Sequence, residues 1–317
     1  MLFLVVMLGI DTSMILDMGK VAVVGSANLD FVFRCPELPR PGETLLGGSF
    51  STHPGGKGAN QATAIAALKG SVQFVGCVGD DPEGEFLVTT LSEAGVGIER
   101  LQVIQGRRTG TACVLVSDSS SNMIVVAPGA NNEVSSAQVT SAHGHIKPDI
   151  VLCQLEIPIA SVTAAAQVDR FILNPAPAQP LSSELLARCF VLTPNESELE
   201  SLTGIRPDTL EDCEKAAKPL LEAGVQNVII TLGSRGCSWA SESGVTHFPS
   251  RKVDAIDTTA AGDAFNGALA HFLAEGRTIL EAIPLANAVA AISTTKVGAQ
   301  ESMPSMGELQ AFAPDLF

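Results

Sequence analysis

Stretches rich in β-branched and other apolar residues alternate with Ala- and Leu-rich stretches along the chain from Lys20 onward. Such alternation builds a mostly parallel sheet with helices on both faces. We therefore predict one large, doubly wound α/β domain over residues 20–317. Its strands are expected at about 21–27, 71–79, 149–153, 170–174, 189–193 and 227–232, with helices at about 58–68, 83–94 and 209–223 and in the last part of the chain.

Two segments with short alternating runs interrupt this series, at about 28–54 and 105–127. The first is broken by prolines, which are typical of exposed strands rather than of a buried sheet. The simplest assembly joins both segments into one small antiparallel β-sheet that projects from the main domain as a lid. Such a sheet needs a cover for its apolar side, from a ligand or from a second copy of the chain, and this predicts a homodimer through the lid. The residues expected on that side are Phe31, Phe33, Val114 and Val116.

Residues 1–19 stand outside this pattern, and we expect them to form a disordered N-terminal extension. The run from Leu2 to Ile10 is apolar, but no basic residue precedes it and it is too short to cross a membrane as a helix. Met18 lies directly before the first strand and is a candidate start of the protein. We expect no membrane-spanning segment elsewhere, so the sequence predicts a cytoplasmic protein.

Charge and cysteine content narrow the possible functions. The chain has 34 acidic and 19 basic residues, and its net charge of −15 disfavours binding to nucleic acid or to an anionic membrane. The seven cysteines are odd in number and form no CxxC pair, so we interpret them as buried thiols in a reducing compartment. His143 and His145 form an HxH pair without a third ligand at suitable spacing, and we interpret them as part of a solvated loop rather than a metal site.

The segment DTTAAGDAFNG at 257–267 is the strongest indication of chemistry. Its small residues from Thr258 to Gly262 let the backbone approach a ligand, and a helical composition follows. A turn of this kind directs unpaired N–H groups at one point, which forms an anion hole suited to a phosphoryl group during transfer. Asp263, in the first helical turn, can then accept a proton from an attacking hydroxyl group. The alternative is that Asp263 is an ordinary helix N-cap.

A second glycine turn, PGGKGANQ at 54–61, also leads into a helix. It is not a P-loop, because a glycine follows the lysine where Ser or Thr is required, and the first strand lacks the glycines of a dinucleotide-binding turn. Lys57 and Asn60 suit hydrogen bonds to hydroxyl groups, and Asn28 and Asp30 after the first strand offer more. Ordinary turn chemistry is the alternative explanation for these four residues.

Two further turns follow predicted strands, at the strand ends where open α/β sheets bind ligands. TLGSRGC at 231–237 ends one strand with a glycine turn that can lie along a nucleotide. TPNESE at 193–198 places Asn195 and Glu198 at the start of a helix. Glu198 can hold Mg²⁺ through water, or it can complete a capping box with Asn195.

Together these segments resemble the ribokinase branch of the PfkB carbohydrate kinase family. The resemblance extends from about Lys20 to Pro304. It rests on GGKGANQA at 55–62 and DTTAAGDAFNGA at 257–268, with PGAN, CQLEIP, LNPAPA, TPNESE and TLGSRG between them in the family's order. It implies a large α/β domain with a β-sheet lid and the ATP-dependent phosphorylation of D-ribose to ribose 5-phosphate. ATP is then the co-substrate, with Mg²⁺ and an activating K⁺ as cofactors.

The resemblance also implies roles for single residues. Asp263 would be the base, beside an anion hole formed by Ala260, Ala261 and Gly262. The sugar would contact Asn28, Asp30, Gly56, Lys57, Asn60, Glu156 and Asp263. ATP would contact Asn195, Thr231, Leu232, Gly233, Ser234, Arg235, Gly236, Gly262 and Asn287. Glu198 would hold Mg²⁺ through water, and a monovalent cation would lie near Asp257, Thr259, Ser293, Lys296, Gly298 and Ser302.

The sequence departs from the family pattern between Glu156 and Asn174, where the chain is several residues shorter than is typical. The helix after Ile157 is therefore expected to be cut short, or the entry to the next strand altered.

Two other functions stay open. One is a related kinase that acts on a nucleoside, on fructose or on a keto-deoxy acid, and ribose is not ranked against deoxyribose or other pentoses. The other is a sugar-binding regulator without catalysis, which the intact Asp263 and glycine turn argue against.

Overall fold

The central sheet has nine strands in the computed structural model, which describes residues 19–119 and 122–317. Neighbouring strands from β11 to β5 run parallel, and β12 and β13 form an antiparallel hairpin at one edge. This agrees with the predicted α/β architecture. In spatial order the strands are β13 (Gly244–Phe248), β12 (Cys237–Ser241), β11 (Val228–Thr231), β10 (Cys189–Leu192), β9 (Phe171–Leu173), β8 (Ile150–Cys153), β1 (Lys20–Val24), β4 (Ser71–Gly79) and β5 (Gly97–Ile104).

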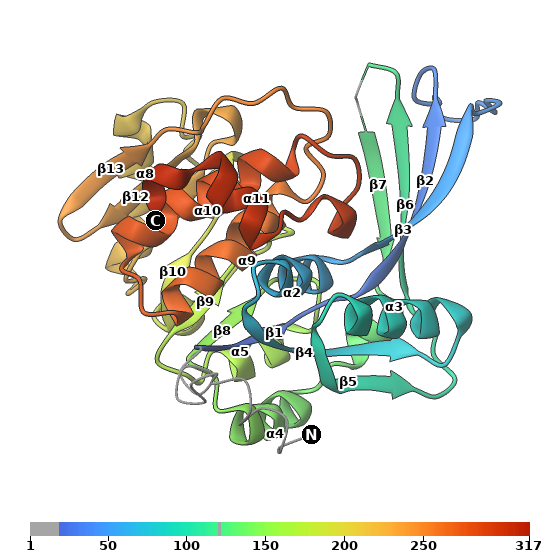
Figure 1. Ribbon diagram of the computed structural model, residues 1–317, viewed down its shortest axis with the longest axis horizontal. Coiled ribbons are helices and arrows are strands. Elements are labelled where there is room, and N and C mark those ends of the chain that lie inside the picture. Colours follow the sequence, from blue (N-terminus) through green and yellow to red (C-terminus); the bar gives the residue numbers. More distant parts are fainter. Residues whose placement is uncertain (1–18, 120–121) are drawn as a thin grey trace, which may run out of the picture.

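Helices cover both faces of this sheet (Figure 1). Side chains alternate along β1, so that Val21 and Val23 face one helical layer while Ala22 and Val24 face the other. The first layer contains α2 (Lys57–Ala67), α3 (Pro82–Glu93), α9 (Ala261–Ala274), α10 (Ile279–Ser293) and α11 (Met306–Phe312). The second contains α4 (Ser136–Ile146), α5 (Ile159–Ala165), α6 (Ser183–Leu186), α7 (Glu196–Thr203) and α8 (Leu210–Glu222).

The strand order turns back at β1, and this fixes where a ligand can bind. From β1 the chain adds β4 and β5 on one side, and it then returns to add β8, β9, β10 and β11 on the other. Loops at the carboxyl ends of β1 and β8 therefore leave the sheet toward opposite sides. In open α/β sheets the crevice at such a switch point is the usual ligand site.

A separate four-stranded sheet stands away from the main body in Figure 1. Its order is β3 (Ser49–Gly55), β2 (Asn28–Cys35), β6 (Gly110–Ser117) and β7 (Asn122–Ala127). The β2–β3 and β6–β7 pairs are antiparallel, and a parallel β2–β6 pair joins them. Because β2 begins four residues after the end of β1, the main domain and the small sheet are connected by a very short segment.

The apolar side of the small sheet differs from the predicted one. Phe31 and Phe33 pair with Cys113 and Leu115, whereas Val114 and Val116 pair with residues of β2 that point to the opposite face. Placing Val114 and Val116 beside the two phenylalanines was therefore wrong, because residues in register share a face and successive residues alternate. The outer apolar face, as we call it from here on, consists of Phe31, Phe33, Phe50, Cys113, Leu115, Met123 and Val125.

The HxH pair lies in a helix rather than in the predicted loop. Helix α4 runs through His143 and His145. Its N-cap is Ser135, whose hydroxyl oxygen accepts a hydrogen bond from the Gln138 N–H over 3.1 Å. The loop interpretation was wrong because Ser-rich, Gly-containing sequence has low intrinsic helix propensity, which packing of the helix overrides. After Ile157, where a helix cut short or an altered strand entry was expected, α5 has seven residues and β9 has three.

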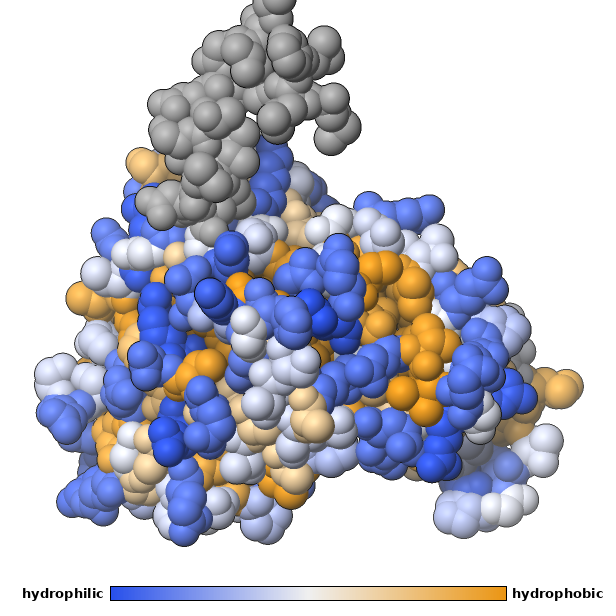
Figure 2. Space-filling model, turned by 90° about the horizontal axis from the view of Figure 1, so that it is seen from below, coloured by the Kyte–Doolittle hydropathy of each residue, from blue (hydrophilic) through white to orange (hydrophobic). Residues whose placement is uncertain are grey.

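Within the described residues, no helix combines the length and the apolar composition needed to span a membrane. The expected N-terminal extension, including Met18, lies outside the described residues except for Gly19. Seen from below in the orientation of Figure 1, the surface shows hydrophilic residues interspersed with hydrophobic ones (Figure 2).

Candidate active site

The first turns of α2 and α9 lie together at the carboxyl ends of β1 and β8. Two glycines permit this approach. Gly56 precedes α2 with φ of 87°, and a Cβ on it would lie 2.7 Å from the Asn28 backbone nitrogen. Gly267 lies where α9 crosses α2, and a Cβ there would lie 2.6 Å from the Gln61 carbonyl oxygen. The close crossing brings the side chains of α2 against the start of α9.

The carboxylate of Asp263 is held by two side-chain amides from α2. Asn60 Nδ2 donates to Asp263 Oδ2 and Gln61 Nε2 donates to Asp263 Oδ1, each over 2.9 Å. Asp263 is 6% exposed, and burial raises its pKa, although Lys57 and the two amide bonds oppose the rise. The N-cap of α9 is Ala260, so the alternative that Asp263 is an ordinary N-cap is wrong.

The turn before Asp263 has the geometry of an anion site. Ala260 adopts a left-handed conformation with φ of 58°, and α9 begins at Ala261. The space around Gly262 is open, since a Cβ on it would meet nothing within 4 Å. Asn266 Nδ2 donates to the Gly262 carbonyl oxygen over 2.8 Å and holds the turn in place. The first N–H groups of a helix lack intrahelical partners, so this turn can bind an anionic ligand.

Polar residues expected at the sugar site lie around the same point, and two residues that the sequence did not indicate hold them. Ser26 Oγ donates to Glu156 Oε2 over 2.5 Å, and the Lys57 backbone N–H donates to the same oxygen over 3.2 Å. Asn131 Nδ2 donates to Asn28 Oδ1 over 2.7 Å. Ser26 and Asn131 thus orient Glu156 and Asn28.

Electrostatics tie the predicted residues into one cluster around Lys57. Burial, followed by repulsion from Glu156, raises the pKa of Asp30 to about 7. Burial alone would lower the pKa of Lys57, but the carboxylates of Asp263, Glu156, Glu198 and Asp30 outweigh it, so its pKa is raised. The ammonium group of Lys57 therefore stays charged and offsets part of the negative charge of these carboxylates.

The turn at 231–236 borders a second part of the site. Gly233 and Gly236 have φ of 56° and 93°, and the Leu232 N–H donates to the Gly236 carbonyl oxygen over 2.8 Å. A cavity of about 440 Å³ lies along this turn, a size typical of small-molecule sites. Its lining includes Leu232, Ser234, Arg235, Cys213, His247 and Pro249.

Three other residues expected at the nucleotide lie at the edges of this region. Thr231, in the first part of the turn, forms an isolated β-bridge with Asn195. Asn287 Nδ2 donates to the Phe248 carbonyl oxygen over 3.3 Å.

Arg235 and Glu198 make structural contacts within this region. The guanidinium of Arg235 donates to Glu196 Oε1 over 2.5 Å and to the Asp208 carbonyl oxygen over 2.8 Å, which ties the turn to α7. Glu198 and Asn195 form a reciprocal capping box at the start of α7. The capping alternative for Glu198 is therefore confirmed, and burial raises the pKa of this carboxyl.

The residues expected around a monovalent cation are only partly brought together. Asp257 Oδ1 accepts from the Thr259 N–H and hydroxyl over 2.9 and 2.6 Å, and Asp257 Oδ2 accepts from the Gly298 N–H over 3.1 Å. In contrast, Lys296 Nζ donates to Glu308, and the hydroxyls of Ser293 and Ser302 donate to backbone carbonyls three residues earlier. No three His, Cys, Asp or Glu side chains within residues 19–119 and 122–317 form a group that could hold a metal ion.

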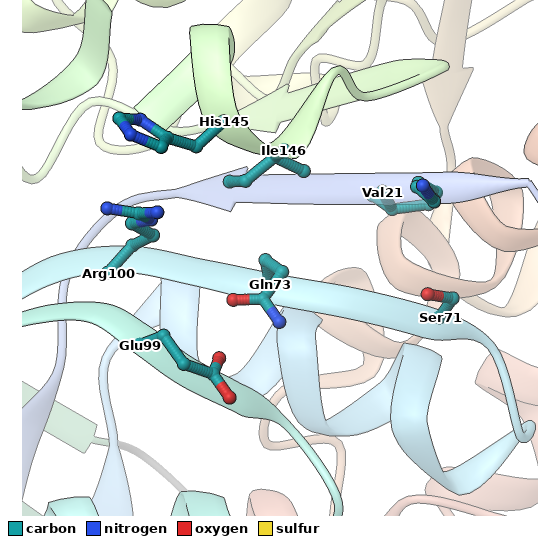
Figure 3. A pocket seen from close by; sticks show the side chains of 8 residues that line it. Val21, Ser71, Gln73, Glu99, Arg100, His145 and Ile146 are labelled. Atoms are coloured by element: carbon teal, nitrogen blue, oxygen red, sulfur yellow. The ribbon is translucent and has the colours of Figure 1, made fainter. Parts of the chain in front are cut away.

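A further cavity lies at the opposite end of the sheet. Its volume is about 300 Å³, and Val21, Gln73, Arg100 and His145 are among the residues that line it (Figure 3). It contains none of the predicted site residues and lies near the amino end of β1, away from the polar cluster.

Three buried polar residues next to the site were also missed by the sequence analysis. Gln61, Gln154 and Asn174 lie in the quoted segments GGKGANQA, CQLEIP and LNPAPA, but no local pattern distinguishes a polar residue of the network around Asp263 from one in a turn. Their positions could have given a signal, since Gln154 and Asn174 directly follow β8 and β9.

Comparisons with known proteins agree with this geometry. The model of the pfkB family carbohydrate kinases matches residues 18–306. Ribokinase of Haemophilus influenzae is 40% identical over 296 residues, which cover 92% of this chain and 97% of that protein. A deoxyribokinase of Salmonella typhi is 34% identical over 299 residues, which cover 92% and 98%. The structure of Arabidopsis thaliana ribokinase complexed with ribose and ATP superimposes with a TM-score of 0.84 at 31% identity, over 93% of this chain and 98% of that one. The chain therefore belongs to the pfkB family of carbohydrate kinases, as its motifs predicted.

Proposed function

We propose that the protein transfers the γ-phosphate of ATP to the primary hydroxyl group of D-ribose and forms ribose 5-phosphate. The observation that carries this proposal is the buried carboxylate of Asp263, held by Asn60 and Gln61 directly after the turn formed by Ala260, Ala261 and Gly262. A base next to an anion-binding helix end is what attack by a hydroxyl group on a phosphoryl group requires. Similarity to ribokinases over 92% of the chain supports ribose as the sugar.

The sugar hydroxyls bind to the polar cluster below the small sheet. Hydroxyl groups donate to the carboxylates of Asp30 and Glu156, while Lys57 and the amides of Asn28 and Asn60 offer donors. Gly56 lets the backbone come close. With the sugar in place, Asp263 takes the proton of the attacking hydroxyl, and the N–H groups at the start of α9 stabilise the charge on the transferring phosphoryl group.

ATP lies along the 231–236 turn, with its base in the cavity of about 440 Å³ and its phosphates toward Gly262. Asn195 and Asn287, at the edges of this region, face the nucleotide. Mg²⁺ fits beside Glu198 through water, because each oxygen of this carboxylate accepts one hydrogen bond from Asn195 and keeps a lone pair for water. When bound, Mg²⁺ neutralises charge on the phosphates.

Potassium fits near the loops that Asp257 joins. The carboxylate of Asp257 holds both the Thr259 segment and the Gly298 segment through hydrogen bonds, so it orders the backbone carbonyls around them. Ser293, Lys296 and Ser302 contribute to the site through their backbone, since their side chains are engaged elsewhere. A large, weakly hydrated cation suits such carbonyls. When bound there, it would supply positive charge that favours a phosphate at the anion-binding turn.

The small sheet acts as a lid, and two copies of it form a homodimer. The face that carries Asp30 and His53 points toward the main domain, where His53 Nδ1 lies 3.1 Å from Glu301 Oε1. The outer apolar face consequently points away from the active site, and Phe33, Phe50, Met123 and Val125 on it are 41–70% exposed. So many exposed apolar side chains on one sheet face support a partner surface of the same kind, which is a second lid.

Thiol reactivity tests the dimer. Of the seven free cysteines only Cys113 is exposed, and it lies in the outer apolar face. We expect light scattering to give a dimer at micromolar concentration, with Cys113 slow to react with a thiol reagent. Phe33→Asp should produce a monomer with a fast-reacting Cys113, whereas Phe86→Asp, at an exposed phenylalanine of α3, should not. A wild-type monomer with a fast-reacting Cys113 would contradict the dimer.

A coupled assay for ADP tests the function. We expect ADP formation to depend on ribose and to equal the amount of ribose phosphate formed. Deoxyribose is the second candidate, favoured by the relative from Salmonella typhi, and a higher kcat/KM for it than for ribose would replace ribose as the substrate. Ribose binding without turnover would instead identify a regulator.

The cysteines also bear on the compartment. All seven are free thiols, which supports a reducing compartment, and we place the reaction in the cytoplasm.

A further inference from the structure

A chain of buried amides leads from Asp263 to the carboxyl ends of three neighbouring strands. Gln61 Nε2 donates to Asp263 Oδ1 over 2.9 Å and to Asn174 Oδ1 over 3.2 Å. Gln61 Oε1 accepts from Gln154 Nε2 over 2.5 Å. Asn174 Nδ2 in turn donates to the Thr193 carbonyl oxygen over 3.2 Å. Gln154, Asn174 and Thr193 directly follow β8, β9 and β10, so the central sheet anchors the chain.

These contacts permit one orientation of the Gln61 amide. Its two hydrogens go to Asp263 and Asn174, and its oxygen accepts from Gln154. A flipped amide would place its oxygen against two acceptors and its NH₂ group against another NH₂ group. Gln61 and Gln154 are 0% exposed, so water cannot replace a lost partner without a rearrangement of the core.

The backbone also positions Gln61. Helix α2 can reach Asp263 only because Gly267, one turn after Asp263, leaves room for the Gln61 carbonyl oxygen. Since Asn60 and Gln61 are adjacent on α2, their two amides reach the two oxygens of one carboxylate. Asp263 therefore has a defined rotation as well as a defined position.

We propose that Gln61 is a positioning residue, whose amide, itself oriented by Gln154 and Asn174, holds Asp263 ionised and turned toward the sugar hydroxyl. This inference rests on the proposed function, because it concerns the same base. The charged groups that face Asp263 are Lys57, which favours its ionised form, and Glu156, Glu198 and Asp30, which disfavour it. Against this acidic surrounding, a neutral donor supports the ionised form without adding a further charge to the site.

The test compares Gln61→Met with the wild type. Methionine keeps the length and the apolar contacts of the side chain but removes the amide. We expect kcat to fall about 10- to 100-fold, the usual range for a hydrogen bond to a charged group, with the KM for ribose within about twofold. Burial raises the pKa of Asp263 and the Gln61 bond opposes this rise, so its loss should move the acid limb of the kcat/KM profile to higher pH.

Gln138→Met is the matched control. Gln138 is also a buried glutamine with three partners, since its Nε2 donates to the carbonyl oxygens of Gly76 and Arg100 and its Oε1 accepts from the Cys77 thiol. It belongs to α4, which packs on the opposite face of the sheet from α9. We expect this variant to lose thermal stability while its kcat and its pH profile stay at the wild-type values.

Stability gives a readout that needs no turnover. Gln61→Met removes a donor to a carboxylate, so its loss of melting temperature should grow as the pH rises and Asp263 ionises, whereas the loss for Gln138→Met should not change with pH. The proposal would be overturned if Gln61→Met kept the wild-type kcat or the wild-type acid limb of the kcat/KM profile. It would also be overturned if Gln138→Met shifted this acid limb by the same amount. A wild-type protein inactive on ribose counts against the proposed function alone, and the stability comparison then decides on Gln61.

Discussion

The substitution Asp30→Asn should stabilise the protein and impair it as an enzyme. In the free protein the carboxyl group of Asp30 is buried near Glu156, Asp263 and Glu301, and its pKa is raised from 3.8 to about 7. A raised pKa means that the folded state binds the proton more tightly than the unfolded state does. The stability associated with the protonated form is complete below pH 3.8 and is lost as the pH rises through about 7.

The magnitude follows from the two pKa values. At about 1.4 kcal/mol for each pKa unit, the charged carboxylate destabilises the folded state by up to about 4 kcal/mol above pH 7, but by less than about 2 kcal/mol at pH 5. Asparagine has a similar shape and carries no charge. Asp30→Asn should therefore be more stable than the wild type, by about 2 to 3 kcal/mol more at pH 8 than at pH 5.

Urea unfolding without sugar measures this difference, with the fluorescence of Trp239, the single tryptophan, as the signal. The control is Asp169→Asn, which removes the same charge from an exposed position before β9 and should leave the stability unchanged at both pH values. Ribose affinity of Asp30→Asn should fall at least about tenfold, because a charged acceptor for hydroxyl groups is lost. An Asp30→Asn variant that is no more stable than the wild type at pH 8 would refute the reasoning.

Three further predictions concern catalysis and the lid. Asp263→Asn should keep the fold and the ribose affinity but lower kcat at least about 100-fold, and near wild-type turnover would reject Asp263 as the base. Potassium or caesium should raise the rate above that in buffer free of potassium and sodium, and a flat titration with potassium would remove the cation from the proposal. Asp30→Ala should raise the ratio of ATP hydrolysed to sugar phosphorylated, because Asp30 couples the lid to the sugar in the proposed mechanism. An unchanged ratio in a steady-state assay would mean that Asp30 only binds the sugar.

The sequence was most informative where one short segment contains a whole structural unit. GGKGANQA and DTTAAGDAFNGA each combine a turn with the first turn of a helix, so their glycines and their polar residues could be interpreted together. The strands of the main sheet were predictable for a similar reason. A strand buried on both faces is a continuous apolar run, and this signal is local.

Features that depend on pairing between distant segments could not be predicted in the same way. Whether Val114 lies on the same face of the small sheet as Phe31 depends on the register of β2 against β6. A shift of this register by one residue would move Val114 to the other face relative to Phe31. Gln154 and Asn174 become significant only when α2 crosses the carboxyl ends of β8 and β9. Helix α4 was missed because its residues have low helix propensity, and its stability comes from packing.

Two opposing requirements meet at Asp263 and account for the polar residues around it. As the proposed base, Asp263 must be sheltered, because an exposed carboxylate would activate water as readily as a sugar hydroxyl, but burial favours its protonated form. Lys57 favours ionisation through its charge. A second cation in the same place would compete with the start of α9 for the phosphate. The neutral amides of Asn60 and Gln61 instead stabilise the Asp263 carboxylate and do not attract the phosphate. In the proposed mechanism, the use of amides therefore keeps Asp263 ionised while the phosphate binds at the start of α9.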